Sequence, residues 1–292
     1  LKDKSIKALF VVNPNNPASI GMDEHTCDEL IDVVKTYNED LMIISDDVYG
    51  TFVNDFSSLM SKLPYNTLGV YSYSKYFGVT GWRLGTFAVH ERNVFDKKIK
   101  ELKGESKKLV DKRYSDMSLN PSALTFMERV VADSRRVALN HTAGLSTPQQ
   151  VQMAFFSAFA LIDKVDAYKK LNMSICRRRQ RLLFESLGID YVNLENSAAY
   201  YFQFDIDEWG RLNHGQDFVD FMHNNFDASD ILYKLARDYA IVLLGGNGFA
   251  APKWSIRVSL ANLDDRAYIT IGASIKNILN DYVELWKSKK TN

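Results

Sequence analysis

The stretch Ser72-Tyr-Ser-Lys75-Tyr-Phe-Gly-Val-Thr-Gly-Trp-Arg83-Leu-Gly85 carries the strongest signal for the fold. It follows a mostly apolar run, residues 68–73, which reads as a buried strand. Lys75 stands directly after this strand, and the serine hydroxyls and the Arg83 guanidinium around it can donate hydrogen bonds to a phosphate. The stretch therefore predicts a strand-end lysine beside a phosphate-binding turn.

Further apolar runs on either side extend this pattern. Residues 8–12, 41–44 and 84–89 each read as a short strand closed by polar or turn residues. A helix that Asp23 can cap lies between the first two of these strands. This succession of strand, helix, strand and strand predicts a mostly parallel α/β sheet.

The second half of the chain has a different order of expected helices and strands. Residues 97–140 are polar and helical and are expected to form an insertion over the sheet. A helix that starts after Ser146 is expected to carry five apolar side chains inward: Met153, Phe155, Phe156, Phe159 and Leu161. Beyond it we expect, in order, a helix at 166–187, strands at 191–205, 241–244 and 254–260, and a final helix at 265–286. We therefore expect a first domain over residues 1–165 and a smaller α+β domain over residues 166–292.

The composition is that of an ordinary globular protein. Of its 292 residues 46% are hydrophobic, and Lys+Arg and Asp+Glu are both 36, so the formal net charge is zero. No nucleic acid or membrane partner is expected from this balance. Cys27 and Cys176 lie in different expected helices, which favours a reduced, cytoplasmic protein without a metal site. The chain begins with Leu1 and soon enters a buried strand, so we expect a fragment whose N-terminal part is absent.

Polar residues with distinct chemistry follow successive strands. Asn16, Asp46 and Lys75 each lie just past the carboxyl end of an expected strand, the edge where ligands bind in open α/β sheets. A lysine can form a Schiff base with an aldehyde, and a buried carboxylate can keep a pyridine nitrogen protonated. Tyr49 and Asn16 can donate hydrogen bonds to a phenolate oxygen. The set therefore suits pyridoxal 5′-phosphate.

Each of these residues alone has an ordinary explanation. An aspartate at a strand end is more often a helix cap or a turn residue, and a lone lysine there is usually solvated. Arg83 by itself is most often half of a surface ion pair. The whole set, with its order and spacing, indicates a cofactor site much more specifically than any one of its residues.

Four blocks in this order resemble the signatures of fold type I aminotransferases, which depend on pyridoxal phosphate. They are residues 13–17, 45–49, 72–85 and 254–261. The resemblance implies the large domain of that fold, N-terminally incomplete, and a homodimer or larger homo-oligomer. It makes Lys75 the catalytic, cofactor-bearing lysine and Arg257, with Asn16, the group that binds the substrate's α-carboxylate. It assigns the following residues to the cofactor: Asp46 to the ring nitrogen, Tyr49 and Asn16 to the phenolate oxygen, Ser72, Ser74 and Arg83 to the phosphate, and Ser146 to the phosphate of the partner subunit.

A narrower resemblance covers residues 46–52, 71–77 and 140–152, which are similar to the aspartate 4-decarboxylases of this superfamily. It implies β-decarboxylation of L-aspartate to L-alanine and carbon dioxide, with aspartate aminotransferase activity on the side. A plain class I aminotransferase is the alternative among enzymes. A non-catalytic α/β scaffold that lacks the N-terminal cofactor loop is the alternative for these residues alone.

Two positions depart from the aminotransferase pattern. Ala18-Ser19 replaces the Thr-Gly that commonly follows the Asn-Pro turn, and Thr142 stands where an arginine commonly binds the distal carboxylate. The main phosphate loop and the aromatic residue that stacks on the cofactor lie earlier in such enzymes than the region that this chain covers. The second carboxylate of aspartate is therefore expected to be held differently.

Overall fold

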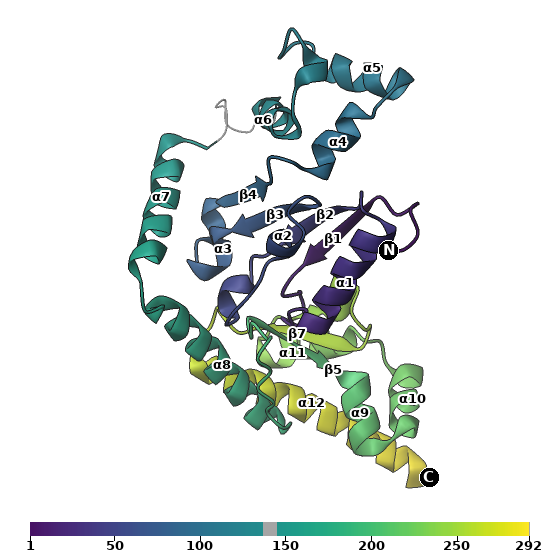
Figure 1. The fold of residues 1–292 in the computed structure, drawn as a ribbon. Helices are drawn as coiled ribbons and strands as arrows, with labels where there is room; N and C mark the ends of the chain where they lie inside the picture. The colour runs from purple at the N-terminus through teal and green to yellow at the C-terminus, as the bar shows by residue number, and fades with distance from the viewer. Residues whose placement is uncertain (137–144, 292) are drawn as a thin grey trace. The chain divides into compact units, whose positions relative to one another are not determined.

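The computed structural model describes residues 1–136 and 145–291 (Figure 1). The chain forms two compact units. Unit 1 contains residues 1–13, 22–50 and 55–166. Unit 2 contains residues 14–21, 51–54 and the chain from Ala167 onward. Two short segments of the N-terminal half therefore belong to the C-terminal unit.

Unit 1 is built on a sheet of four strands in the order β1-β2-β3-β4. The strands are β1 (Ala8–Val12), β2 (Met42–Asp46), β3 (Thr67–Ser72) and β4 (Gly85–Val89). The first three are parallel and β4 is antiparallel to β3, which confirms the expected mostly parallel α/β fold. The crossover helix α1 (Glu24–Tyr37) begins where Asp23 accepts a hydrogen bond from the Thr26 amide.

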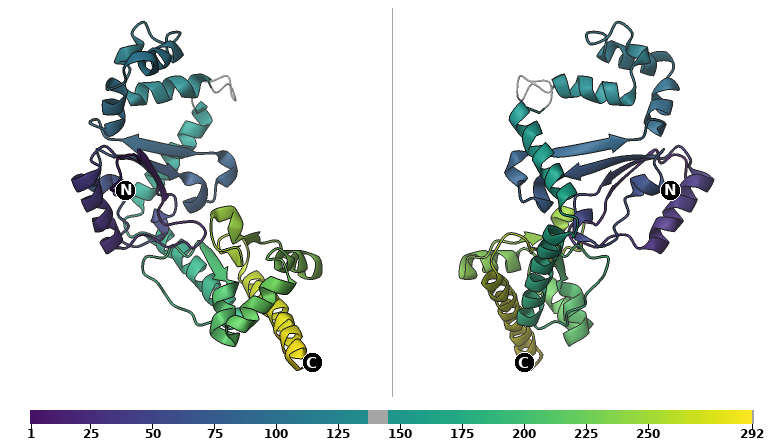
Figure 2. Two further views of the ribbon diagram at one scale, coloured as in Figure 1. Left: turned by 90° about the vertical axis from the view of Figure 1, so that its right-hand side faces the viewer. Right: turned by 60° about the vertical axis from the view of Figure 1, so that its left-hand side comes forward.

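The core of this sheet region is formed by aliphatic side chains from α1, from β2 and its preceding residue, and from the segment after η1. They are Ile31, Val34, Leu41, Ile43, Leu59 and Leu63. The remaining helices of the first half are η1 (Gly50–Phe52), α2 (Leu59–Lys62), α3 (Tyr73–Tyr76), η2 (Thr80–Trp82), α4 (Val94–Lys100), α5 (Gly104–Arg113), η3 (Pro121–Ala123), α6 (Phe126–Arg136) and α7 (Thr147–Ile162). Figures 1 and 2 show α4, α5 and α6 together on the β4 side of the sheet.

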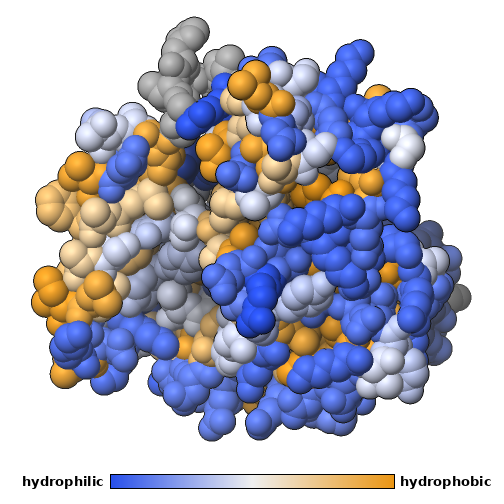
Figure 3. All heavy atoms as spheres, turned by 45° about the horizontal axis from the view of Figure 1, so that its top comes forward, coloured by the Kyte–Doolittle hydropathy of each residue, from blue (hydrophilic) through white to orange (hydrophobic). Residues whose placement is uncertain are grey.

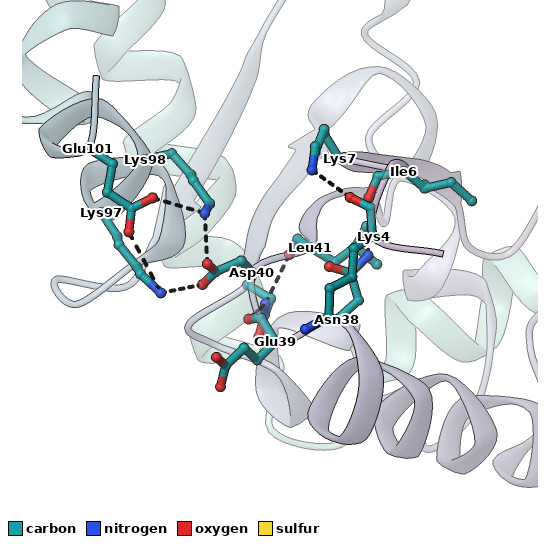
Figure 4. Close-up of polar contacts among 11 residues, drawn as sticks. Lys4, Ile6, Lys7, Asn38, Glu39, Asp40, Leu41, Lys97, Lys98 and Glu101 are labelled. Carbon is teal, nitrogen blue, oxygen red and sulfur yellow. Dashed lines mark hydrogen bonds and ion pairs between the residues drawn. The ribbon is translucent and has the colours of Figure 1, made fainter. Parts of the chain in front are cut away.

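An ion-pair cluster ties this helical insertion to the sheet (Figure 4). Asp40, just before β2, accepts hydrogen bonds from Lys97 Nζ and Lys98 Nζ of α4, each at 2.7 Å. Desolvation raises the pKa of Asp40, but the hydrogen bonds and charges of the two lysines outweigh it and lower the pKa overall. The cluster therefore holds the first turn of the insertion against the start of β2.

Helix α7 differs from the sequence expectation. Of the five side chains expected to point inward, Met153 and Phe156 are partly buried. Phe155, Phe159 and Leu161 have exposed fractions of 65%, 47% and 70%, so the expectation is wrong for these three. Only part of the helix packs: Phe156 stacks on Phe77 with ring centroids 4.6 Å apart. An apolar helix sequence predicts that a face will be covered, but it does not identify the segment that covers it. Hydrophobic patches between hydrophilic side chains also mark the face drawn in Figure 3.

Unit 2 has a small antiparallel sheet in the order β5-β7-β6. Its elements are α8 (Ala167–Leu187), β5 (Tyr201–Asp205), α9 (Ile206–His214), α10 (Gln216–Asn225), α11 (Asp230–Tyr239), β6 (Leu244–Gly245), η4 (Gly246–Phe249), β7 (Ser255–Ser259) and α12 (Asp265–Thr291). Helices α8 and α12 approach so closely that a Cβ on Gly272 would meet the Leu183 carbonyl oxygen at 2.7 Å. The core between helices and sheet includes Phe218, Leu235 and Tyr268, all fully buried.

Two strands of unit 2 are shorter than the sequence predicts. Of residues 191–205 only Tyr201–Asp205 form a strand, because the preceding segment instead pairs locally with residues 14–21, through Ile20 and Ser197. Likewise β6 is confined to Leu244–Gly245. No helix among residues 1–136 and 145–291 is long and apolar enough to span a lipid bilayer.

Candidate active site

The carboxyl ends of β2 and β3 place the candidate residues of unit 1 along one edge of the sheet. These strands are parallel, and Asp46, the last residue of β2, pairs with Val70 of β3. Tyr49 follows three residues later and is buried. Lys75 lies in α3, which begins directly after β3, and its side chain is partly buried. The shared edge is the one that sequence reasoning predicted.

The Asp46 carboxyl is partly desolvated and weakly compensated. Its Oδ1 accepts one hydrogen bond, from the Val48 amide at 3.1 Å, and none of the ion pairs among the described residues includes it. Burial raises the pKa of Asp46 above its ordinary value. A carboxylate in this state is stabilised by a cationic N–H partner, such as a protonated pyridine nitrogen. The observed surroundings of Asp46 therefore fit the expected cofactor.

The adjacent carboxyl, that of Asp47, is held differently. Burial also raises its pKa, but Ser45 Oγ donates a hydrogen bond to Asp47 Oδ1 at 2.7 Å, and the Ser58 hydroxyl lowers the pKa in part. Asp47 is therefore bonded within the protein, and Asp46 keeps more capacity for an external donor.

The candidate phosphate residues are only partly assembled. Ser72 caps α3: its Oγ donates to Ser74 Oγ at 2.9 Å and accepts from the Ser74 amide at 3.2 Å. Arg83 has an exposed side chain whose Nη1 donates to the Thr80 carbonyl oxygen at 3.0 Å. Its φ of 55° is an unusual conformation for a residue with a side chain, often found at functional sites. Ser72 and Arg83 both line a hollow of about 460 Å³ beside β3 and β4.

Ser146 stands at the start of α7. Its backbone amide and its Oγ both donate to Gln149 Oε1, at 3.1 Å and 3.0 Å. The observed role of this serine is thus the start of a helix. Its expected contact with a partner subunit's phosphate stays a prediction. Thr142, the other residue singled out in this region, lies outside the described residues.

Unit 2 brings two other candidates into contact. Arg257 Nη1, on β7, donates to Asn16 Oδ1 at 3.0 Å. The guanidinium carbon lies 4.2 Å from the ring centroids of both Tyr201 and Phe249, so aromatic rings fix the plane of the guanidinium. Arg257 Nε is buried and has no hydrogen-bond acceptor among the described residues. An oriented cation with a free donor suits a carboxylate ligand.

Sequence reasoning missed the two aromatic residues in this arrangement. Tyr201 belongs to an aromatic-rich strand, and Phe249 follows a glycine-rich turn, Gly245–Gly248, but neither position carried a signal of its own. The pairing of strands β5 and β7 could have indicated Tyr201, because Gln203, two residues further along β5, lies opposite Arg257.

Asn16 is positioned by a loop in which Ser19 departs from the aminotransferase pattern. Ser19 has a φ of 61°, a left-handed conformation that glycine adopts without strain, and its side chain is fully buried. Its Oγ accepts a hydrogen bond from the Tyr201 amide at 2.8 Å, and its carbonyl oxygen accepts one from the Ala198 amide at 2.8 Å. The hydroxyl therefore compensates for the backbone strain and joins the loop to β5.

We expect Ser19→Ala to lower the free energy of unfolding by about 1–3 kcal/mol, since the strain stays and the buried Tyr201 amide loses its acceptor. Ser19→Gly should cost less, because glycine adopts this φ freely. Urea denaturation followed by circular dichroism measures both. An alanine variant as stable as the parent protein would contradict this account of Ser19.

Comparison with known proteins follows the same lines. The family model described as aminotransferase class I and II matches residues 1–270. A Pseudomonas protein, the bifunctional aspartate aminotransferase and L-aspartate beta-decarboxylase, is 45% identical over 288 residues, which are 99% of this chain and 54% of that protein. The chain thus spans about half the length of this relative. The aspartate aminotransferase of Sulfolobus acidocaldarius is 34% identical over 101 residues, covering 33% of this chain and 24% of that protein.

Solved structures give the same fold. An aminotransferase from Staphylococcus aureus superposes with a TM-score of 0.61 at 17% identity, covering 94% of this chain and 59% of its own. The aspartate aminotransferase of Thermus thermophilus with maleate superposes with a TM-score of 0.57 at 20% identity, covering 92% and 56%. At these identities the likeness concerns the fold alone.

Proposed function

The chain belongs to the class I and II aminotransferase family, and from this premise we propose that the protein decarboxylates L-aspartate at its β-carboxylate, giving L-alanine and carbon dioxide. Aspartate aminotransferase activity would accompany this reaction. The observation that carries the proposal is the 45% identity to the bifunctional Pseudomonas protein across 99% of this chain. We further propose a large domain over residues 1–165, a small domain over residues 166–292, and a cytoplasmic homodimer or larger assembly.

Pyridoxal phosphate is the cofactor that the proposed site would use, and when bound it supplies an electron sink for charge that develops at the substrate Cα. Lys75 would hold its aldehyde carbon, and Lys75 Nζ would take the proton from Cα. Asp46 would keep the proton on the ring nitrogen. Tyr49 and Asn16 would donate hydrogen bonds to the ring oxygen.

The phosphate and the substrate carboxylate would be bound by separate groups. Ser72, Ser74 and Arg83 would donate to the phosphate, and Ser146 would do so for the partner subunit. Arg257 would bind the α-carboxylate of the substrate with Asn16 beside it, because the guanidinium is already oriented between two aromatic rings and Nε is unpaired among the described residues.

The fate of the β-carboxylate separates the two candidate reactions. An arginine paired with this carboxylate would stabilise an anion that decarboxylation discharges, and each ~1.4 kcal/mol of such stabilisation lowers the rate tenfold. The sequence has Thr142 where aspartate aminotransferases commonly place that arginine. This favours decarboxylation. The match to aspartate aminotransferases over about a third of the chain keeps plain transamination as the second candidate.

The test is to incubate the intact enzyme with aspartate and no keto acid. Alanine and carbon dioxide should form in equal amounts over many turnovers, as measured by amino-acid analysis and trapped carbon dioxide. A single burst of oxaloacetate, equal to the amount of enzyme and without alanine, would leave only the aminotransferase function.

A further inference from the structure

A second hollow lies in unit 1 among the helices of the insertion. Its volume is about 340 Å³, and none of the residues assigned above to catalysis or cofactor binding lines it. Helices α4, α5 and α6 supply most of its wall, and Met42, the first residue of β2, closes one side. The hollow belongs to a part of the chain for which the proposed reaction gives no role.

The wall is mainly aromatic and aliphatic. Phe95 and Phe126 stack with ring centroids 4.8 Å apart and an interplanar angle of 23°. Ile99, Leu102 and Val110 add aliphatic surface. A volume near the lower end of roughly 300–1,000 Å³, apolar walls and a few polar groups are the usual features of small-molecule sites. Such a wall suits an apolar ligand body and does not suit aspartate, which is short and carries two carboxylates.

One buried cation in the lining has a hydrogen-bond donor without an acceptor among the described residues. Arg129 is only 4% exposed. Its Nε donates to the Leu124 carbonyl oxygen at 3.0 Å and its Nη2 to the Pro121 carbonyl oxygen at 2.7 Å, while its guanidinium lies 4.9 Å from the Tyr114 ring centroid. Nη1 is buried and has no acceptor among the described residues. Leaving a buried charged donor without a hydrogen bond is costly, so this position favours an incoming acceptor.

The other charges of the lining are already paired and leave an excess of positive charge. Asp133 is the acid, and it accepts from Arg113 Nη2 at 2.9 Å and from the Tyr114 hydroxyl at 2.9 Å. Lys98 is bound to Asp40, outside the hollow. Because carboxylates pair with Lys98 and Arg113, Arg129 remains as the cation of the lining that has no carboxylate partner among the described residues, and its charge favours an anion.

We propose that this hollow binds a small monocarboxylate with an apolar body, an aryl or medium-chain carboxylate, at a site separate from the active site. The body would pack against Phe95 and Phe126, and the carboxylate would accept from Arg129 Nη1. Because Nη1 is buried, the carboxylate of the ligand can reach it only after a side chain of the lining changes its rotamer. Such changes are common on binding. The ligand is thus recognised by one buried guanidinium in an apolar wall.

The test uses 2-naphthoate as the probe and 2-naphthalenemethanol as its uncharged counterpart, in fluorescence and calorimetric titrations of the intact protein. We expect saturable binding of one naphthoate per chain and an affinity for the alcohol about 10–100-fold weaker, the equivalent of a charged hydrogen bond of roughly 1.5–3 kcal/mol. Excess aspartate should not displace the probe. No saturable binding, equal affinity for both probes, or displacement by aspartate would each overturn the proposal.

Matched variants locate the probe. Val110→Trp fills the hollow and should remove binding, whereas Leu109→Trp, on the neighbouring residue with 68% of its surface exposed and outside the lining, should not change it. Equal behaviour of the two tryptophan variants would contradict the site. Arg129→Met keeps the aliphatic part of the side chain and removes the charge, so it should make the affinities for the two probes equal. If loss of the hydrogen bonds to Leu124 and Pro121 unfolds this variant, the comparison of Val110→Trp with Leu109→Trp still tests the site.

Discussion

Replacing Lys75 with alanine is expected to lower turnover of aspartate by at least about 10²–10⁴-fold, the usual contribution of a positioned acid–base group. The reason is that this one amine would both hold the cofactor and move the proton at the substrate Cα. Lys75 lies directly after β3, in a short helix that Ser72 caps, so its backbone is fixed next to the candidate phosphate residues. Steady-state assay of alanine formation measures the effect.

A chemical readout separates this role from a structural one. Borohydride reduces the carbon–nitrogen double bond between a lysine amine and an aldehyde, so treatment of the cofactor-loaded enzyme should label the peptide that contains Lys75. The control is Lys62→Ala, at the end of α2, which should leave both the label and the turnover unchanged. A label on any other lysine would refute the assignment.

The sequence predicted the sheet well where the strands are short, continuous apolar runs. Residues 8–12 form β1 as expected, and β2 and β3 end at Asp46 and Ser72, next to the residues chosen for their chemistry. Such runs are typical of strands in parallel sheets whose two faces are both covered. The expected burial of the first run is wrong, because Phe10 of β1 is 66% exposed. The same reasoning was wrong for part of the expected inward face of α7, where Phe155 and Leu161 are exposed. Apolar residues on a helix show that a surface is apolar, but not that this chain covers it.

For the candidate site, the sequence alone could not predict contacts between residues that are far apart in the chain. Asn16 and Arg257 touch although 241 positions separate them, and only the family resemblance connected them beforehand. The aromatic rings of Tyr201 and Phe249 against Arg257 were not foreseen, because each comes from a different element and neither type of residue is unusual in a strand or turn. The hollow with Arg129 could not be predicted either, since only the folded helices show that Arg129 Nη1 has no acceptor among residues 1–136 and 145–291.

Replacing Asp46 with alanine is expected to lower turnover about 10²–10⁴-fold, because removing one partner of a buried ion pair costs roughly 3–5 kcal/mol. The cofactor should still attach to Lys75, which visible absorbance would show, but its ring nitrogen would lose the carboxylate that keeps it protonated. Asp47→Ala is the control and should be much milder, since Asp47 is bonded to Ser45 within the protein.

Stability measurements distinguish this from a structural role of Asp46. Burial raises the pKa of Asp46 in the folded cofactor-free protein, so the charged carboxylate opposes folding at pH values above its unfolded pKa, and this penalty disappears as pH falls below that value. At pH 7 the cofactor-free Asp46→Ala protein should therefore unfold at the same urea concentration as the parent protein or a higher one. A clear loss of stability together with a small loss of turnover would mean that Asp46 serves the fold rather than the cofactor. Unchanged or higher stability with a large loss of turnover is the result that the weakly compensated carboxyl at the end of β2 leads us to expect.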